Sequence, residues 1–145
     1  YSAGGMGAFV IKTAYGKCTM GPMRAFISGI LCNILVCAAV LISTAAKDAV
    51  GKLMGVFFPI MAFVVAGWEH SVANMFYLPA GIFAAHHSAY VQKAQELYGL
   101  TTQQIQQHVN LSGFFGNILP VTLGNIVGAM VCMALPLYLA RKGRP

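Results

Sequence analysis

Residues 53–85 form a 33-residue apolar run that carries Glu69 and His70 at its centre. A transmembrane helix needs about 20 apolar residues, so this run is too long for one simple crossing. Ionisable side chains within a membrane are costly and usually functional. The run therefore predicts two half-helices that are separated by a polar break near residues 67–70.

Three helix-breaking residues, Pro59, Gly67 and Pro79, interrupt the same run. A helix that faces lipid tolerates such residues only where neighbouring protein or water satisfies the freed backbone groups. We therefore expect the centre of the run to line a cavity or to pack against other helices.

The composition of the chain is that of an integral membrane protein. Of its 145 residues 58% are hydrophobic and only 8% are charged, whereas about 25% of a soluble domain is charged. The net charge of +6 comes from nine basic residues, which lie at the edges of apolar runs and form no patch with interleaved aromatic residues. This arrangement excludes a nucleic-acid partner.

Two further stretches are long and apolar enough to cross the membrane. Residues 25–46 contain no charge, and their one strongly polar side chain, Asn33, should face the protein interior. Residues 118–140 contain Asn125. Together with Asn125, three small residues predict a face where another helix approaches closely: Gly124, Gly128 and Ala129.

The segments between these spans are more polar. We expect residues 1–24 to form a membrane-surface connection that starts at the end of a truncated helix, and residues 47–52 to form a charged hairpin. Residues 86–117 should be an external loop with a short helix after Thr101. Lys47 and Lys52 must share a side with the basic C-terminal segment, because two crossings separate them, and that side should be cytoplasmic. This segment contains Arg141, Lys142 and Arg144.

His70 has the strongest case for a functional role. Histidine, with an unperturbed pKa of about 6.5, can exchange a proton near neutral pH without a permanent charge. Glu69 is its neighbour, and adjacent residues diverge by about 100° on a helix. We therefore expect one of the two side chains to line a passage through the membrane and the other to have a structural role. Glu69 and Asn74 could clamp the break together with a basic partner.

The chain lacks the usual spacings of metal ligands. It has no H-E-x-x-H motif, and His86 and His87 are adjacent, so they would diverge on a helix. No C-x-x-C spacing occurs among its cysteines: Cys18, Cys32, Cys37 and Cys132. We expect no metal site, no cofactor and no enzymatic activity. Haem ligation by His70 and a second histidine stays open as an alternative.

Three motifs resemble the formate/nitrite transporter family. They are GWEHSVANMF at 67–76, continuing to Pro79, CNILVC at 32–37 and LPVTLGNIVG at 119–128. The resemblance covers nearly the whole chain, and residues 86–116 are its least similar part.

The resemblance implies an all-α integral membrane protein with an aquaporin-like helical bundle. In that fold six membrane helices form two inverted three-helix repeats, and the channel is a homopentamer with one pore per protomer. Residues 1–145 resemble the second, C-terminal repeat, beginning near the end of the third helix. Its broken central helix would be the interrupted span at 53–85. The N-terminal half of the same channel would then be a partner.

The resemblance also implies roles for individual residues. His70 would be the central pore histidine and Asn33 its hydrogen-bonding partner. Val36 would belong to the cytoplasmic constriction and Phe63 to the periplasmic one. Lys17, sixteen residues before Asn33, matches the family lysine that would join Glu69 and Asn74.

We therefore expect a channel of the inner (plasma) membrane that passes formate, nitrite or hydrosulfide, with protons exchanged at His70. Protonation would remove the cost of taking an anion through an apolar constriction. Two alternatives stay open: an aquaporin-like channel for neutral solutes, although the chain has no Asn-Pro-Ala motif, and a haem-binding membrane anchor of a redox enzyme.

Overall fold

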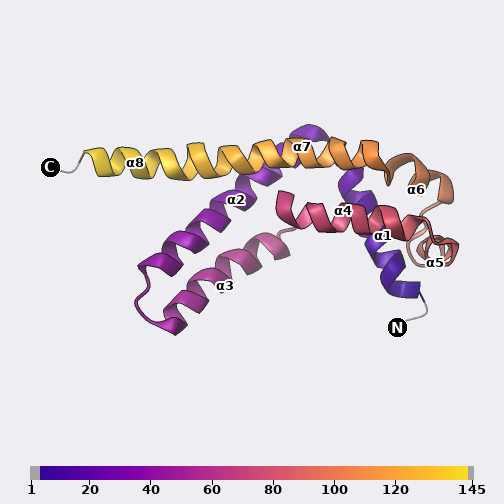
Figure 1. Cartoon of the computed structure of the whole chain (residues 1–145), viewed down its shortest axis with the longest axis horizontal. Helices are drawn as coiled ribbons and strands as arrows, with labels where there is room; N and C mark the ends of the chain where they lie inside the picture. The colour runs from indigo at the N-terminus through magenta and orange to yellow at the C-terminus, as the bar shows by residue number, and fades with distance from the viewer. Residues whose placement is uncertain (1–3, 144–145) are drawn as a thin grey trace. The chain divides into compact units, whose positions relative to one another are not determined.

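The computed structural model describes residues 4–143, which fold into helices joined by short connections (Figure 1). The helices fall into two compact units. The first contains residues 4–22 and 72–119, and the second contains residues 23–71 and 120–143. Arg144, expected on the cytoplasmic side, lies outside the described residues. The expectation of an all-α chain is confirmed for residues 4–143.

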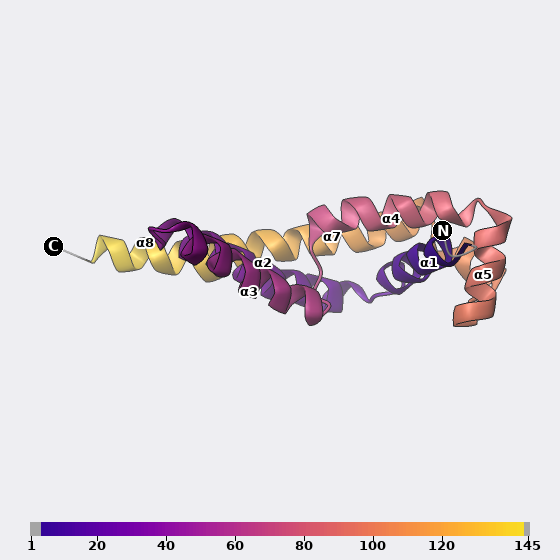
Figure 2. The same cartoon turned by 90° about the horizontal axis from the view of Figure 1, so that it is seen from below.

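The first unit is built around α1 (Gly5–Cys18), α4 (Ser71–Ala85), α5 (Ser88–Tyr98) and α6 (Thr102–His108). Helix α1 packs against α5 (Figure 2). Residues 5–18, expected to belong to a surface connection, instead form α1. Small or apolar residues at every third position, Ala8, Ile11 and Ala14, give this helix a buried face. The buried core consists of Ala8, Ile11, Ala14, Leu78, Ala94, Ile105 and Val109.

Two glycines permit the close packing of α1. A Cβ atom on Gly7 would overlap the ring of Tyr90 in α5, and one on Gly81 of α4 would overlap the Cβ atom of Ala14. Glycine at these two positions is therefore what lets α4 and α5 approach α1.

The segment expected as an external loop contains more helix than predicted. The short helix after Thr101 is confirmed as α6, which begins with a capping box between Thr101 and Gln104. Helix α5 precedes it, and α7 (Leu111–Val127) begins seven residues before the expected position. Asn110 explains this early start, because its Oδ1 accepts a hydrogen bond from Gly113 N at 3.0 Å and so caps the first turn of α7.

The second unit contains α2 (Pro22–Ala45), α3 (Ala49–Val65), the end of α7, a π-helical segment (Gly128–Ala134) and α8 (Leu135–Lys142). Helices α2 and α3 form an antiparallel hairpin (Figure 1). Asp48 caps α3 by accepting a hydrogen bond from Gly51 N at 2.8 Å. Two helices, Pro22–Ala45 and the continuous Leu111–Lys142, are long and apolar enough to cross a membrane.

Helix α7 approaches α2 closely in the second unit. A Cβ atom on Gly29 would lie 2.8 Å from Val121 O of α7, and one on Gly128, which begins the π-helical segment, would lie 2.5 Å from Ile30 O. A Cβ atom on Gly124 would overlap Phe26 O. The predicted close approach at Gly124 and Gly128 is confirmed, and it brings polar groups of α7 next to the backbone of α2.

Candidate functional site

The interrupted run breaks between Val65, where α3 ends, and Ser71, where α4 begins. Gly67 adopts a left-handed backbone (φ 67°). Its N–H donates to Val64 O at 3.1 Å, and the next N–H, that of Trp68, donates to Phe63 O at 3.0 Å. This is the Schellman arrangement, in which a glycine ends a helix and satisfies its last carbonyls.

Pro59 and Pro79 do not interrupt their helices, contrary to expectation. They lie inside α3 and α4, which continue through them. Each proline removes one backbone hydrogen bond, but ending a helix in apolar surroundings would leave several backbone groups unsatisfied. The break is therefore confined to residues 66–70.

The side chain of Asn125, in α7, holds the far edge of this break. Its Nδ2 donates to Glu69 O at 3.1 Å and to Gly29 O of α2 at 2.8 Å. Its Oδ1 accepts from Ser71 N, the first residue of α4, at 2.8 Å. One buried amide thus satisfies backbone groups on both sides of His70, although it does not bond to His70 itself through these contacts.

Helix α2 supplies two more polar contacts at the same place. Ser28 Oγ accepts a hydrogen bond from Glu69 N at 2.9 Å. Asn33 Nδ2 donates to the main-chain oxygen of Asn125 at 2.6 Å. Its expected bond to His70 stays a prediction, but Asn33 does contact the residue that fixes the backbone beside His70.

Phe63 and His70 lie together across the break. Their ring centroids are 5.7 Å apart and the ring planes are inclined by 27°, which is a stacked arrangement. Phe63 is 9% exposed, whereas His70 is half-buried. The stack places an apolar ring on one face of the only histidine of the second unit.

Val36, expected in the cytoplasmic constriction, lines an apolar groove of about 260 Å³ between α2 and the C-terminal part of the last helix. Cys37 and Val40 flank it on α2. Ala129 and Met133 of the π-helical segment line the opposite wall. The groove offers no charged group, so it suits an apolar barrier to ions.

A second polar cluster lies in the first unit. Asn117 of α7 accepts a hydrogen bond from Asn74 Nδ2 at 2.7 Å and donates one to Lys17 O at 3.0 Å. Lys17 Nζ lies 5.9 Å from the ring centroid of Tyr77. Asn117 therefore bonds the side chain of Asn74 and the main chain of Lys17, two residues of the expected polar network. Glu69, the third, is buried in the second unit, and its joining with them stays a prediction.

Sequence reasoning missed the organising roles of Asn125, Asn117 and Ser28. From the sequence, Asn125 predicts only a close helix approach, and Asn117 falls within the expected external loop. The available signal was the cost of an asparagine in an apolar helix, which predicts a buried hydrogen-bond partner without identifying it.

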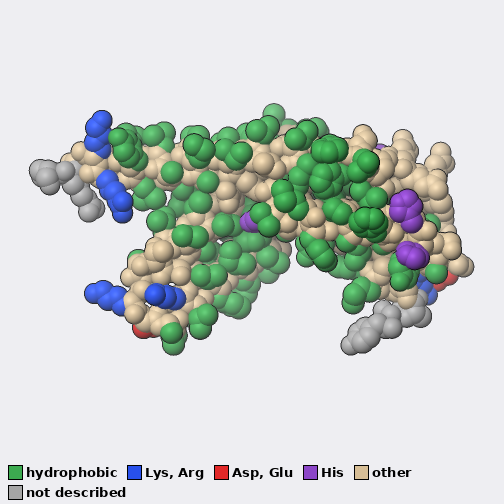
Figure 3. Space-filling view, in the orientation of Figure 1, with side chains coloured by type: hydrophobic (Ala, Val, Ile, Leu, Met, Phe, Trp, Pro, Cys, Tyr) green, Lys and Arg blue, Asp and Glu red, His purple; other side chains and the backbone are tan. Residues whose placement is uncertain are grey.

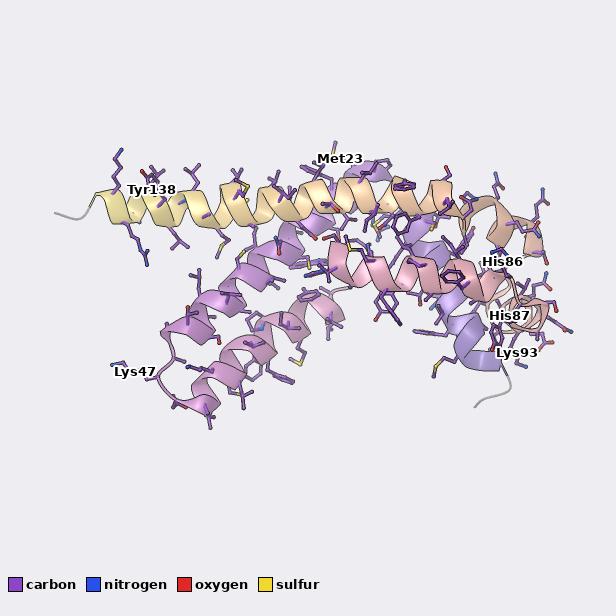
Figure 4. All side chains as sticks on the ribbon, in the orientation of Figure 1. Met23, Lys47, His86, His87, Lys93 and Tyr138 are labelled. Carbon is purple, nitrogen blue, oxygen red and sulfur yellow. The ribbon has the colours of Figure 1, made fainter. Side chains whose placement is uncertain are left out.

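The remaining histidines lie in the first unit. His86 and His87 follow the end of α4 (Figure 4), and the His87 ring lies 5.1 Å from that of Tyr90. His108 ends α6 and contacts Tyr15 edge to face at 5.6 Å. Within residues 4–143 no three His, Cys, Asp or Glu residues are grouped so that they could hold a metal ion.

Comparison with known proteins assigns the chain to one group. The profile of the formate/nitrite transporter family matches residues 1–139. The uncharacterized transporter YrhG of Bacillus subtilis is 42% identical over 90% of this chain and 41% of its own length. The formate channel FocA of Haemophilus influenzae is 38% identical over 91% of this chain and 46% of its own. The chain thus spans less than half the length of these curated relatives.

Solved structures give the same result for the fold. A pentameric formate channel with formate bound superposes with a TM-score of 0.80 at 32% identity, covering 97% of this chain and 55% of that one. An ion channel of the same family superposes with a TM-score of 0.71, also at 32% identity, covering 91% of this chain and 45% of that one. The helices described above therefore have the fold of these channels over about half of a protomer.

Proposed function

The chain belongs to the formate/nitrite transporter family, and from this premise we propose that it is part of a membrane channel for small monovalent weak-acid anions: formate, nitrite or hydrosulfide. The observation that carries the proposal is the stack of His70 on Phe63 at a helix break whose backbone is held by Asn125. An imidazole ring that can bind or release a proton, held in place at a helix break, is suited to contact an anion. We propose no enzymatic activity and no cofactor.

The proposed mechanism follows from the cost of desolvation. A monovalent anion loses its hydration in an apolar passage, and this costs far more than moving the neutral acid. His70 would share or donate a proton at the point of greatest desolvation, and the proton would return to the histidine or leave with the solute. Phe63 and Val36 would form the apolar constrictions on the two sides of His70. The burial of Phe63 and the apolar groove beside Val36 support this role.

Lys17, Glu69 and Asn74 would form a polar network that stabilises the channel. A buried carboxylate within a membrane needs a cationic or hydrogen-bonding partner. Glu69 is 2% exposed, and Asn117 bonds both the side chain of Asn74 and the main-chain oxygen of Lys17. We assign this network to the scaffold and the proton exchange to His70.

The chain would be the second of two inverted repeats, completed by the N-terminal half of the same channel and assembled as a homopentamer in the inner membrane. The coverage of about half of each relative and the pentameric structural neighbour support this proposal. Basic side chains gather at the tip of the α2–α3 hairpin, near Lys47, and at the end of α8 (Figures 3 and 4). By the positive-inside rule this end of the second unit would be cytoplasmic.

A flux assay tests the function. The complete channel that contains this chain would be reconstituted into liposomes, and uptake of formate, nitrite, hydrosulfide and glycerol would be compared with protein-free liposomes. We expect anion uptake and no glycerol uptake. Glycerol uptake without anion uptake would instead establish a neutral-solute channel, and a haem absorption band in the purified protein would establish a redox anchor.

A further inference from the structure

We propose that Asn125 is the positioning residue of the pore, which sets the backbone on both sides of His70 and thereby the direction of the imidazole. The inference rests on the proposed function for its consequence in transport. Its structural part rests on hydrogen bonds alone.

The geometry separates Asn125 from an ordinary packing asparagine. Its amide contacts the residue before His70, Glu69, through the carbonyl, and the residue after it, Ser71, through the N–H. These are the main-chain groups that a helix break leaves without intrahelical partners. With both neighbours fixed, the φ and ψ angles of His70 have little freedom.

The same side chain anchors the break to a rigid support. Its Nδ2 also bonds Gly29 O in α2, at the point where glycines let α2 and α7 come within backbone contact. Asn33 and Ser28 add one bond each between α2 and this cluster. Because α2 and α7 cannot separate without losing these bonds, the position of the break is tied to two long helices.

His70 is the group on which this positioning would act. Glu69 is the only other charged or histidine side chain in residues 25–46, 53–85 and 118–140, which include most of α2, α3, α4 and α7. A change in the direction of His70 should therefore alter proton exchange in transport without removing a titratable group.

The test compares Asn125→Leu with Asn110→Leu in the complete channel. Asn110 is a matched control, because its side chain also makes three bonds with main-chain groups: two donated to Gln106 O and Gln107 O, and one accepted from Gly113 N. It lies in the first unit at the start of α7. Asn125→Gln, which keeps the amide on a longer side chain, replaces Asn125→Leu if the latter does not assemble.

Two measurements would be made on assembled channels. Hydrogen exchange of the segment 69–72 should be faster in Asn125→Leu than in wild type or Asn110→Leu, by about tenfold at Ser71, because the Ser71 N–H loses its acceptor. Formate flux between pH 5 and 8 should fall about tenfold or more at neutral pH in Asn125→Leu, with a shifted pH profile, while Asn110→Leu keeps the wild-type profile.

The outcomes are distinguishable. Unchanged exchange at residues 69–72 in the Asn125 variant would overturn the positioning role, whether or not the channel carries formate. Fast exchange with a wild-type flux profile would show that the break does not control His70, which also overturns it. Absence of formate flux in the wild-type channel would count against the proposed function. Hydrogen exchange at residues 69–72 would still show whether Asn125 fixes the backbone at the helix break.

Discussion

Asn33 of α2 donates from Nδ2 to the main-chain oxygen of Asn125 in α7 at 2.6 Å, so these two asparagines form a chain of contacts that leads to the helix break. Asn33 holds Asn125, and the side chain of Asn125 holds the backbone around His70. Ser28 and Asn33 of α2 and Asn125 of α7 thus all make hydrogen bonds at or beside one break. Any effect of Asn33 on His70 can reach it through this connection.

Asn33→Leu should retain the fold and shift or abolish the pH dependence of formate flux. One hydrogen bond to a carbonyl contributes about 0.5–1.5 kcal/mol to the free energy of unfolding, so the helices should remain packed without it. Thr44→Val is the control, because Thr44 bonds a main-chain oxygen of the same helix, Leu41 O, at 2.9 Å. Flux would be measured in liposomes from pH 5 to 8. An unchanged profile in Asn33→Leu would exclude Asn33 from the control of His70.

The helix break could be predicted from sequence because its signals are local. An ionisable pair in an apolar run and a glycine before it are sufficient to place it, and the left-handed Gly67 provides the helix end. The cap at Asn110 is equally local, and it starts α7 earlier than the apolar pattern alone predicts. The contacts of Asn125 depend on which helix crosses α7, and no spacing in the sequence specifies that.

Gly124→Ala should destabilise the channel, because the new methyl group would overlap Phe26 O in the α2 backbone. Overpacking of this kind typically costs about 1–3 kcal/mol. Gly116→Ala, in the same helix, is the control, since nothing lies within 4 Å of its Cβ position, and alanine there should gain about 0.5–1 kcal/mol of helix propensity. Thermal unfolding in detergent would compare the two. Equal midpoints would mean that the helices are farther apart than described.

Lys17→Ala should reduce thermal stability or pentamer assembly more than it reduces flux per channel. If Lys17 partners the buried Glu69, its loss leaves a carboxylate uncompensated, and breaking a buried pair costs about 3–5 kcal/mol. Lys12→Ala is the control: Lys12 is in the same helix and lies over the rings of Phe9 and Tyr98 at 6.0 and 5.4 Å. Size-exclusion chromatography and thermal unfolding would be set against flux. A stable Lys17→Ala channel that conducts poorly would assign the lysine to the solute path.

His70→Asn should separate a proton-exchanging pore from a passive filter. Asparagine keeps a polar side chain of roughly similar reach, but it cannot become a cation between pH 5 and 8. If the neutral acid crosses the apolar constrictions and the anion does not, the variant should lose anion transport at neutral pH. A residual flux should remain that follows the concentration of neutral acid and rises as the pH falls. His86→Asn is the control, because His86 lies in the first unit after α4 and should leave the profile unchanged. Currents and uptake would be measured with protein shown to be assembled, and equal anion selectivity and pH profiles in wild type and His70→Asn would eliminate the proton-exchange role of His70.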